Sequence, residues 1–92
     1  MAPRSAQTYA LTVLGWLVAR DDLLELFVGS TGSTLESMKE NAQEADFLVS
    51  VLDFLMIDDQ WVLDCCYDTN LDPNNMRLAR LALLGGEEMH WT

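Results

Sequence analysis

Two adjacent cysteines, Cys65 and Cys66, are the residues of this sequence to which a chemistry is most readily assigned. A pair of thiols can bind a metal ion or cycle through a disulfide, and both reactions require the thiolate. Consecutive side chains on a helix diverge by ~100°, so two adjacent sulfurs do not easily serve one ion. Free cysteine also packs as a small apolar residue. We interpret both cysteines as core residues; a metal or redox site is the alternative.

Paired aspartates are the second candidate chemistry. Asp21–Asp22 and Asp58–Asp59 occupy equivalent places between apolar segments, as a duplicated metal or catalytic motif would. Each pair also precedes a predicted helix, where a carboxylate accepts hydrogen bonds from free backbone N–H groups and favours the positive end of the helix dipole. We therefore predict that these aspartates are helix caps.

A row of glutamates follows, with Glu36, Glu40 and Glu44 recurring every four residues. The spacing predicts one face of a helix, and with no histidine or amide cluster nearby we interpret it as a solvated face rather than a cation site. The single histidine, His90, lies in the C-terminal tail without a catalytic partner. Phosphate-binding glycine loops, nucleophile elbows and metal-ligand spacings are absent from the sequence. We predict no catalytic, cofactor-binding or metal-binding residue, and no enzymatic activity.

The net charge of the chain limits the kinds of molecule that it is expected to bind. Fifteen acidic residues against five basic ones give a formal net charge of −10. Few phosphates could be neutralised, so nucleic-acid binding is not expected, although residues 23–42 have the length of a helix-turn-helix. The same charge opposes binding to anionic lipid. A basic protein partner is compatible with it.

The spacing of apolar residues and turn signals predicts six short helices. They run from about residues 5 to 20, 22 to 30, 34 to 43, 46 to 57, 59 to 69 and 73 to 84. The predicted N-terminal caps are Ser5, Asp21 or Asp22, Thr34, Asp46, Asp58 or Asp59, and Asp72 before Pro73. The predicted terminators, which tolerate positive φ, are Gly32, Asn70 and the pair Gly85–Gly86.

An internal repeat organises these helices. A shift of 38 positions aligns residues 9–38 with 47–76 without a gap. Identical pairs include Val13 and Val51, Leu17 and Leu55, and Thr31 and Thr69. The alignment predicts two three-helix units that superpose. Two such units are too few for a solenoid, so we expect a closed bundle.

The fold prediction is an all-α, compact bundle of about six short helices in a single domain, residues 1–92. We expect the core within about 6–84 and a tail from 85 to 92 that carries Met89 and Trp91. The fourth helix should be central, since its polar residues Asp46, Ser50 and Asp53 form only a narrow stripe. The aromatic residues expected at core positions are Trp16, Phe47, Phe54 and Trp61.

Localisation follows from the apolar segments. The stretch 10–19 resembles the core of a signal peptide, but no clean cleavage site follows it, and we interpret it as a helix of the mature protein. No apolar run approaches the ~20 residues of a membrane span. Two cysteines are too few for a disulfide framework. These observations predict a soluble, cytoplasmic protein.

The sequence also resembles a known family. The motifs that carry the resemblance are Asp46-Phe47-Leu48, Val51-Leu52-Asp53-Phe54-Leu55, Asp58-Asp59, Asn70-Leu71-Asp72-Pro73, Ala79-Arg80 and Leu83-Leu84-Gly85. With Ala10-Leu11, Leu17 and Thr31-Gly32 in the first half, residues of about 6 to 86 resemble the bacterial family DUF3572. The resemblance implies a short single-domain protein of unknown function and no catalytic residue.

Two functions remain compatible with the sequence. The first is a small acidic helical module that binds another protein through an acidic or mixed surface. The alternative is a sensor of a small molecule, a metal or redox state, with a cleft near Cys65, Cys66 and Trp61. Partner identity and oligomeric state are left open by the sequence.

Overall fold

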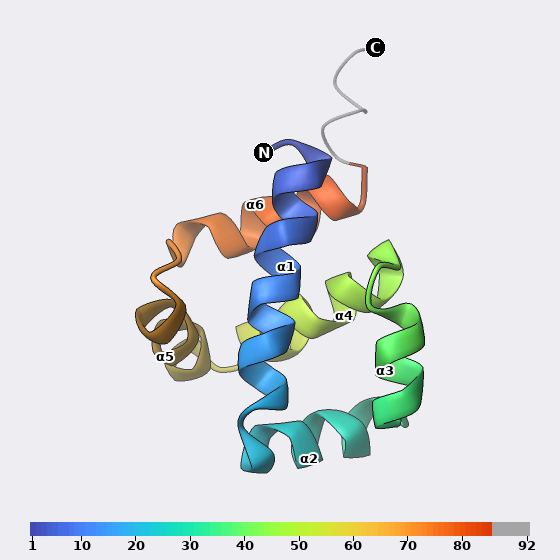
Figure 1. Cartoon of the computed structure of the whole chain (residues 1–92). Helices are drawn as coiled ribbons and strands as arrows, with labels where there is room; N and C mark the ends of the chain where they lie inside the picture. Colours follow the sequence, from blue (N-terminus) through green and yellow to red (C-terminus); the bar gives the residue numbers. More distant parts are fainter. Residues whose placement is uncertain (86–92) are drawn as a thin grey trace.

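Six α-helices make up residues 1–85, the part of the chain that the computed structural model describes (Figure 1). They are α1 (Pro3–Val18), α2 (Asp21–Thr31), α3 (Leu35–Asn41), α4 (Ala45–Met56), α5 (Asp59–Thr69) and α6 (Asn74–Leu83). Residues 1–85 contain no strand, so the predicted all-α bundle is confirmed. Gly86, Met89, His90 and Trp91 lie outside the described residues, as does the tail beyond Gly85.

The core forms where α1 and α4 meet. Helix α1 packs against α2, α4, α5 and α6, and α4 also packs against α5 and α6. The apolar row Ala6, Ala10, Val13 and Leu17 of α1 is fully buried, and the small alanines allow neighbouring helices to approach closely. The predicted central position of α4 is therefore shared with α1.

The polar stripe of α4 lies where the sequence placed it. Asp46 and Asp53 are exposed, and Asp53 pairs with Arg80 of α6. The Ser50 hydroxyl is half-buried and donates a hydrogen bond to the carbonyl oxygen of Phe47, 2.6 Å away. The opposite side of α4 carries Leu52 and Leu55, which have no exposed surface.

Two of the predicted caps are confirmed in full. The Thr34 hydroxyl accepts a hydrogen bond from the Ser37 N–H, and the Ser37 hydroxyl accepts one from the Thr34 N–H, which is a reciprocal capping box. The Asp58 carboxylate accepts a hydrogen bond from the Gln60 N–H at 2.9 Å. A third is displaced by one residue: Asp72 accepts from the Asn74 N–H, but Pro73 precedes the first residue of α6.

The caps predicted at Ser5, at Asp46 and at the Asp21–Asp22 pair are wrong. Helix α1 begins at Pro3, because proline has no N–H to satisfy and its φ already suits a first helical turn. The three aspartates lie inside the first turns of α2 and α4, beyond the cap residues Arg20 and Glu44. There they stabilise the positive end of the helix dipole without capping it.

The predicted terminators Gly32, Asn70 and Gly85 are confirmed, and Gly86 lies outside the described residues. Gly32 after α2 has φ 72°, Asn70 after α5 has φ 61°, and Gly85 after α6 has φ 80°. Gly32 and Asn70 are 38 positions apart, the period of the sequence repeat.

The third helix of each half packs differently. Helix α6 packs against both α1 and α4, whereas α3 contributes the single buried side chain Met38. The superposition of residues 9–38 on 47–76 therefore stays a prediction.

Candidate functional site

The two cysteines lie in the core, on the inner side of α5. Cys65 has no exposed surface and Cys66 is 4% exposed. Burial, with the neighbouring Cys66 as the next cause, raises the pKa of the Cys65 thiol from 9.0 to about 12. The thiolate that metal binding and redox exchange require is disfavoured in this setting. The prediction that both cysteines pack as core residues is confirmed.

Tyr9 closes this part of the core from the side of α1. Its hydroxyl donates a hydrogen bond to the backbone carbonyl oxygen of Asp72 at 2.8 Å and lies 3.7 Å from the sulfur of Cys66. Burial raises the pKa of the phenol above its ordinary value. A neutral tyrosine thus connects α1 to the segment between α5 and α6.

The glutamate row is interrupted. Helix α3 ends at Asn41, so Glu36 and Glu40 lie on it, but Glu44 is the cap residue of α4. The prediction of one continuous face is wrong, because the chain turns at Ala42 and Gln43 before Glu44 is reached. All three carboxylates are exposed, as predicted for a solvated surface. Within residues 1–85, no three histidine, cysteine or acidic residues come together as a metal-binding group.

Aromatic rings line the boundary between α2, α4 and α5. The rings of Phe54 and Trp61 stack at 5.1 Å, and Phe27 meets Phe54 edge to face at 5.3 Å. Phe54 is buried, as is Trp16, but Phe47 and Trp61 are only half-buried. Both pack against the core from its edge, so the predicted packing is confirmed although neither residue is fully buried.

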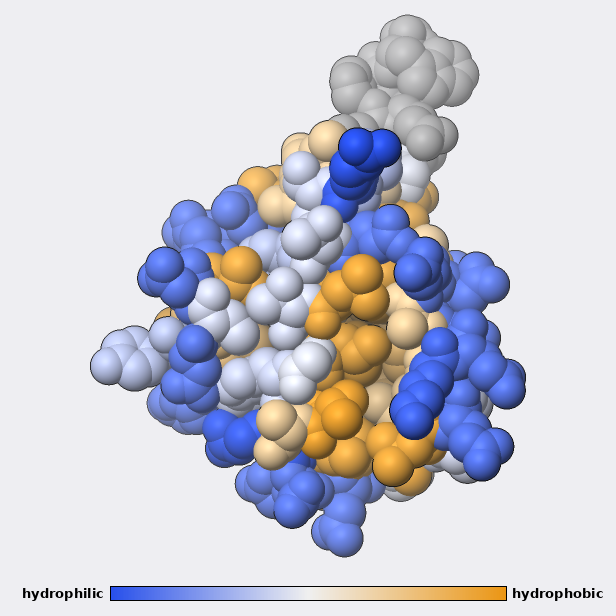
Figure 2. All heavy atoms as spheres, viewed as in Figure 1, coloured by the Kyte–Doolittle hydropathy of each residue, from blue (hydrophilic) through white to orange (hydrophobic). Residues whose placement is uncertain are grey.

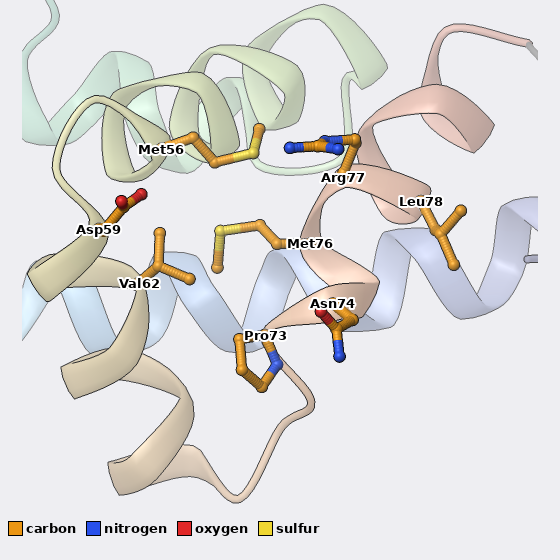
Figure 3. Close-up of a pocket in the computed structure, with 8 residues that line it drawn as sticks. All are labelled: Met56, Asp59, Val62, Pro73, Asn74, Met76, Arg77 and Leu78. Carbon is orange, nitrogen blue, oxygen red and sulfur yellow. The ribbon is translucent and has the colours of Figure 1, made fainter.

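A pocket of about 390 Å³ separates α5 from α6 (Figure 3). Its apolar lining includes the side chains of Met56, Val62 and Met76, and Asp59 and Arg77 bring opposite charges from α5 and α6. Cys65, Cys66 and Trp61 do not line it. The cleft that the sensor hypothesis places near the cysteines and Trp61 is therefore not this pocket.

A second, shallower pocket, which we call the α5 groove, lies along α5 and reaches inward as far as Cys66. It has a volume of about 450 Å³ and is lined by Leu63, Asp64, Cys66, Tyr67, Leu71 and Pro73. Tyr67 is 88% exposed and Leu63 is 52% exposed, so both side chains are accessible to a ligand. Sequence reasoning missed Tyr67; its position one turn after Leu63 was the available signal.

Helix α1 has a second apolar side, opposite to α5. Tyr9 and Trp16 point toward α5, where Trp16 Nε1 donates a hydrogen bond to Asp68 at 2.8 Å. Each residue of a helix turns by ~100°, so Leu11, Leu14 and Val18 lie on the other side. The spacing 11, 14, 18 was visible in the sequence but was not separated from the core row of α1.

Figure 2 shows an apolar area on that side, between α1, α2 and α3, with polar residues around it. We call it the front face. Of the helices that frame it, α1 and α2 carry the partly exposed apolar residues Leu11, Val18, Leu24 and Val28. Helices α5 and α3 lie on opposite sides of α1 (Figure 1).

The fold and these surfaces define a small helical domain with an apolar core and two partly apolar outer faces. The chain belongs to the family DUF3572, described as a protein of unknown function, whose model matches residues 3–86. No curated protein and no solved structure matches the chain. None of the helices within residues 1–85 has the length and apolar character that crossing a membrane requires.

Proposed function

We propose that this protein is an interaction module that binds an amphipathic segment of another protein at the front face. The observation that carries the proposal is the apolar area of Figure 2, which is surrounded by polar residues. Apolar patches with a polar rim are typical of protein-protein contact sites. An amphipathic helix is the partner shape best suited to an apolar area between helices.

Charge supports a basic partner for this face. The neighbouring helices expose Asp21, Asp22 and Glu25 on α2, and Glu36 and Glu40 on α3. Lys39 is the single basic residue of these two helices. Lysine or arginine residues flanking the apolar side of a partner helix would meet complementary charge, which accelerates association and selects among partners.

The sensor alternative is less well supported. It requires reactive thiols, and both cysteines are buried, with the pKa of Cys65 raised. We further propose that the protein catalyses no reaction, binds no nucleic acid and acts in the cytoplasm. The net charge of −10 and the apolar core support it.

Capture experiments with matched variants test the front face. The wild-type chain and two variants, Val18→Gln and Leu78→Gln, are used as baits in a lysate of the native organism, and retained proteins are identified by mass spectrometry. Val18 on α1 is 39% exposed and Leu78 on α6 is 46% exposed. Each substitution therefore replaces one partly exposed aliphatic side chain by a polar one.

We expect a partner that the wild type and Leu78→Gln retain and Val18→Gln loses. A partner lost equally from both variants, or lost only from Leu78→Gln, would contradict the assignment of the front face. Circular dichroism of each bait establishes that the helices are intact.

A further inference from the structure

The α5 groove presents an apolar ridge beside an acidic one. Residues four apart lie above one another on a helix, so Leu63 and Tyr67 form one ridge and Asp64 and Asp68 form the next. Asp64 lines the groove, whereas Asp68 lies on the same ridge beyond the residues that line it. The tyrosine ring is almost fully exposed, and Leu71 and Pro73 extend the apolar lining past the end of α5. A ligand in the groove would therefore touch an aromatic ring and a carboxylate at the same time.

Both carboxylates keep acceptor capacity for such a ligand. Asp64 accepts one hydrogen bond through Oδ1, from the Gln60 side-chain amide at 2.8 Å. Asp68 accepts one through Oδ2, from Trp16 Nε1 at 2.8 Å, and this bond holds its carboxylate in place. Their other oxygens, Asp64 Oδ2 and Asp68 Oδ1, have no hydrogen-bond partner within residues 1–85.

The basic residues of the chain are far in sequence from the α5 groove. Between Lys39 and Arg77 there are nine acidic residues and no basic one. Within residues 1–85, the Arg20 guanidinium lies 4.8 Å from the centroid of the Trp16 ring and reaches Asp22 rather than Asp64 or Asp68. The groove therefore offers negative charge and an aromatic face to a cation from elsewhere.

We propose that the α5 groove binds an arginine side chain, with an adjacent apolar residue, from a segment of a partner protein. The planar guanidinium stacks on Tyr67 and bonds the free oxygens of Asp64 and Asp68, while the apolar neighbour fills the space beside Leu63, Leu71 and Pro73. Arginine is preferred over lysine because its fork of N–H donors matches two carboxylates and its plane stacks on aromatic rings. Phosphate-bearing ligands are repelled by the same carboxylates.

The probe for this site is an acetylated, amidated pentapeptide with one arginine between two leucines. Matched peptides carry lysine, or the neutral isostere citrulline, in place of the arginine. The full chain is titrated with each peptide, and amide chemical shifts are followed by NMR. We expect the arginine peptide to shift the amides of α5, the lysine peptide to bind more weakly and the citrulline peptide not to bind.

Substitutions of exposed residues distinguish stacking of the arginine on Tyr67 from general electrostatic attraction to the acidic protein. Tyr67→Ala should weaken binding by about two- to fivefold, and Tyr67→Phe should leave it unchanged, because the ring alone provides the cation–π contact. Asp64→Asn should weaken binding by about two- to fivefold. Glu36→Gln on α3 makes the same change of charge away from the groove and should have little effect.

Binding that is insensitive to Tyr67→Ala, or equally weakened by Asp64→Asn and Glu36→Gln, would overturn the proposal. A second copy of the chain is the other occupant to test, by sedimentation of the wild type and of Tyr67→Ala without peptide. An oligomer that Tyr67→Ala dissociates would also overturn it. None of these outcomes depends on Val18, so the groove and the front face are judged separately.

Discussion

The hydroxyl of Tyr9 donates a hydrogen bond to the backbone carbonyl oxygen of Asp72, 63 residues further along the chain, at 2.8 Å. The bond ties α1 to the segment that leads into α6, and Tyr9 itself is 6% exposed. Removal of the donor leaves the carbonyl oxygen without this partner. Tyr9→Phe should therefore lower the free energy of unfolding by about 1 kcal/mol, the usual worth of such a bond.

Urea denaturation followed by circular dichroism measures this change. The control is Tyr67→Phe, which removes the same atom from a ring that is 88% exposed and should change stability by less than about 0.5 kcal/mol. Equal stability losses in the two variants would show that the Tyr9 bond contributes nothing specific.

The buried side of α4 should be sensitive to truncation. Leu52 and Leu55 have no exposed surface, so Leu52→Ala and Leu55→Ala should each lower the free energy of unfolding by about 2 to 5 kcal/mol. Leu81→Ala on α6 removes the same atoms from a side chain that is 46% exposed and should cost much less. Denaturant melts that place Leu52→Ala or Leu55→Ala within about 0.5 kcal/mol of wild type would remove α4 from the core.

The left-handed backbone conformation of Gly32 and Asn70 should make both positions sensitive to replacement by alanine. Their φ angles of 72° and 61° are unfavourable for a residue with a β-carbon and no compensating side-chain hydrogen bond. Gly32→Ala and Asn70→Ala should each destabilise the protein by about 1 kcal/mol, whereas Asn70→Gly should be tolerated.

Replacement of glycine by alanine inside a helix should instead increase stability. A β-carbon at Gly15 of α1 would meet no atom within 4 Å, so Gly15→Ala should stabilise the protein by about 0.4 to 1 kcal/mol. Thermal melts of Gly32→Ala and Gly15→Ala should shift in opposite directions. A shift of both in one direction would contradict the role of backbone conformation.

The thiols should react only when the protein opens. Cys65 and Cys66 are buried, so a small alkylating reagent should modify them far more slowly in the native protein than in urea. Mass spectrometry of timed samples gives both rates. Rapid modification of both cysteines in the folded protein, together with a bound metal or a reversible redox change, would favour the sensor hypothesis.

Alkaline pH should weaken the fold through Cys65. Its folded-state pKa of about 12 lies above the ordinary value of 9.0, so the unfolded chain releases the thiol proton first. The stabilising contribution is complete below pH 9 and is lost as pH rises toward 12. Cys65→Ala should show a smaller loss of unfolding free energy between pH 9 and 11 than the wild type, measured by urea denaturation at each pH.

The helices were predictable because their signals are local. Gly32, Asn70 and the Thr34 capping residue act on neighbours within four positions, and the structure confirms each of them. The caps predicted at Ser5 and Asp46 were wrong for an equally local reason, since a helix tolerates several starting points within one turn. The burial of Cys65 and Cys66 was also predictable, because their apolar character agrees with the inner side of α5.

The sequence by itself determined the all-α class, the succession of six helices and the acidic character, because helix periodicity, turn residues and charge are read from neighbouring positions. The tertiary structure alone decided that Tyr9 reaches Asp72 and Trp16 reaches Asp68, and that α6 rather than α3 packs on both α1 and α4. The two hydrogen bonds join residues more than fifty positions apart, and α6 is separated from α4 by the whole of α5. Which of many apolar and polar surfaces meet over such separations depends on how all six helices fill one core together, and that choice left Tyr67 and the front face outside.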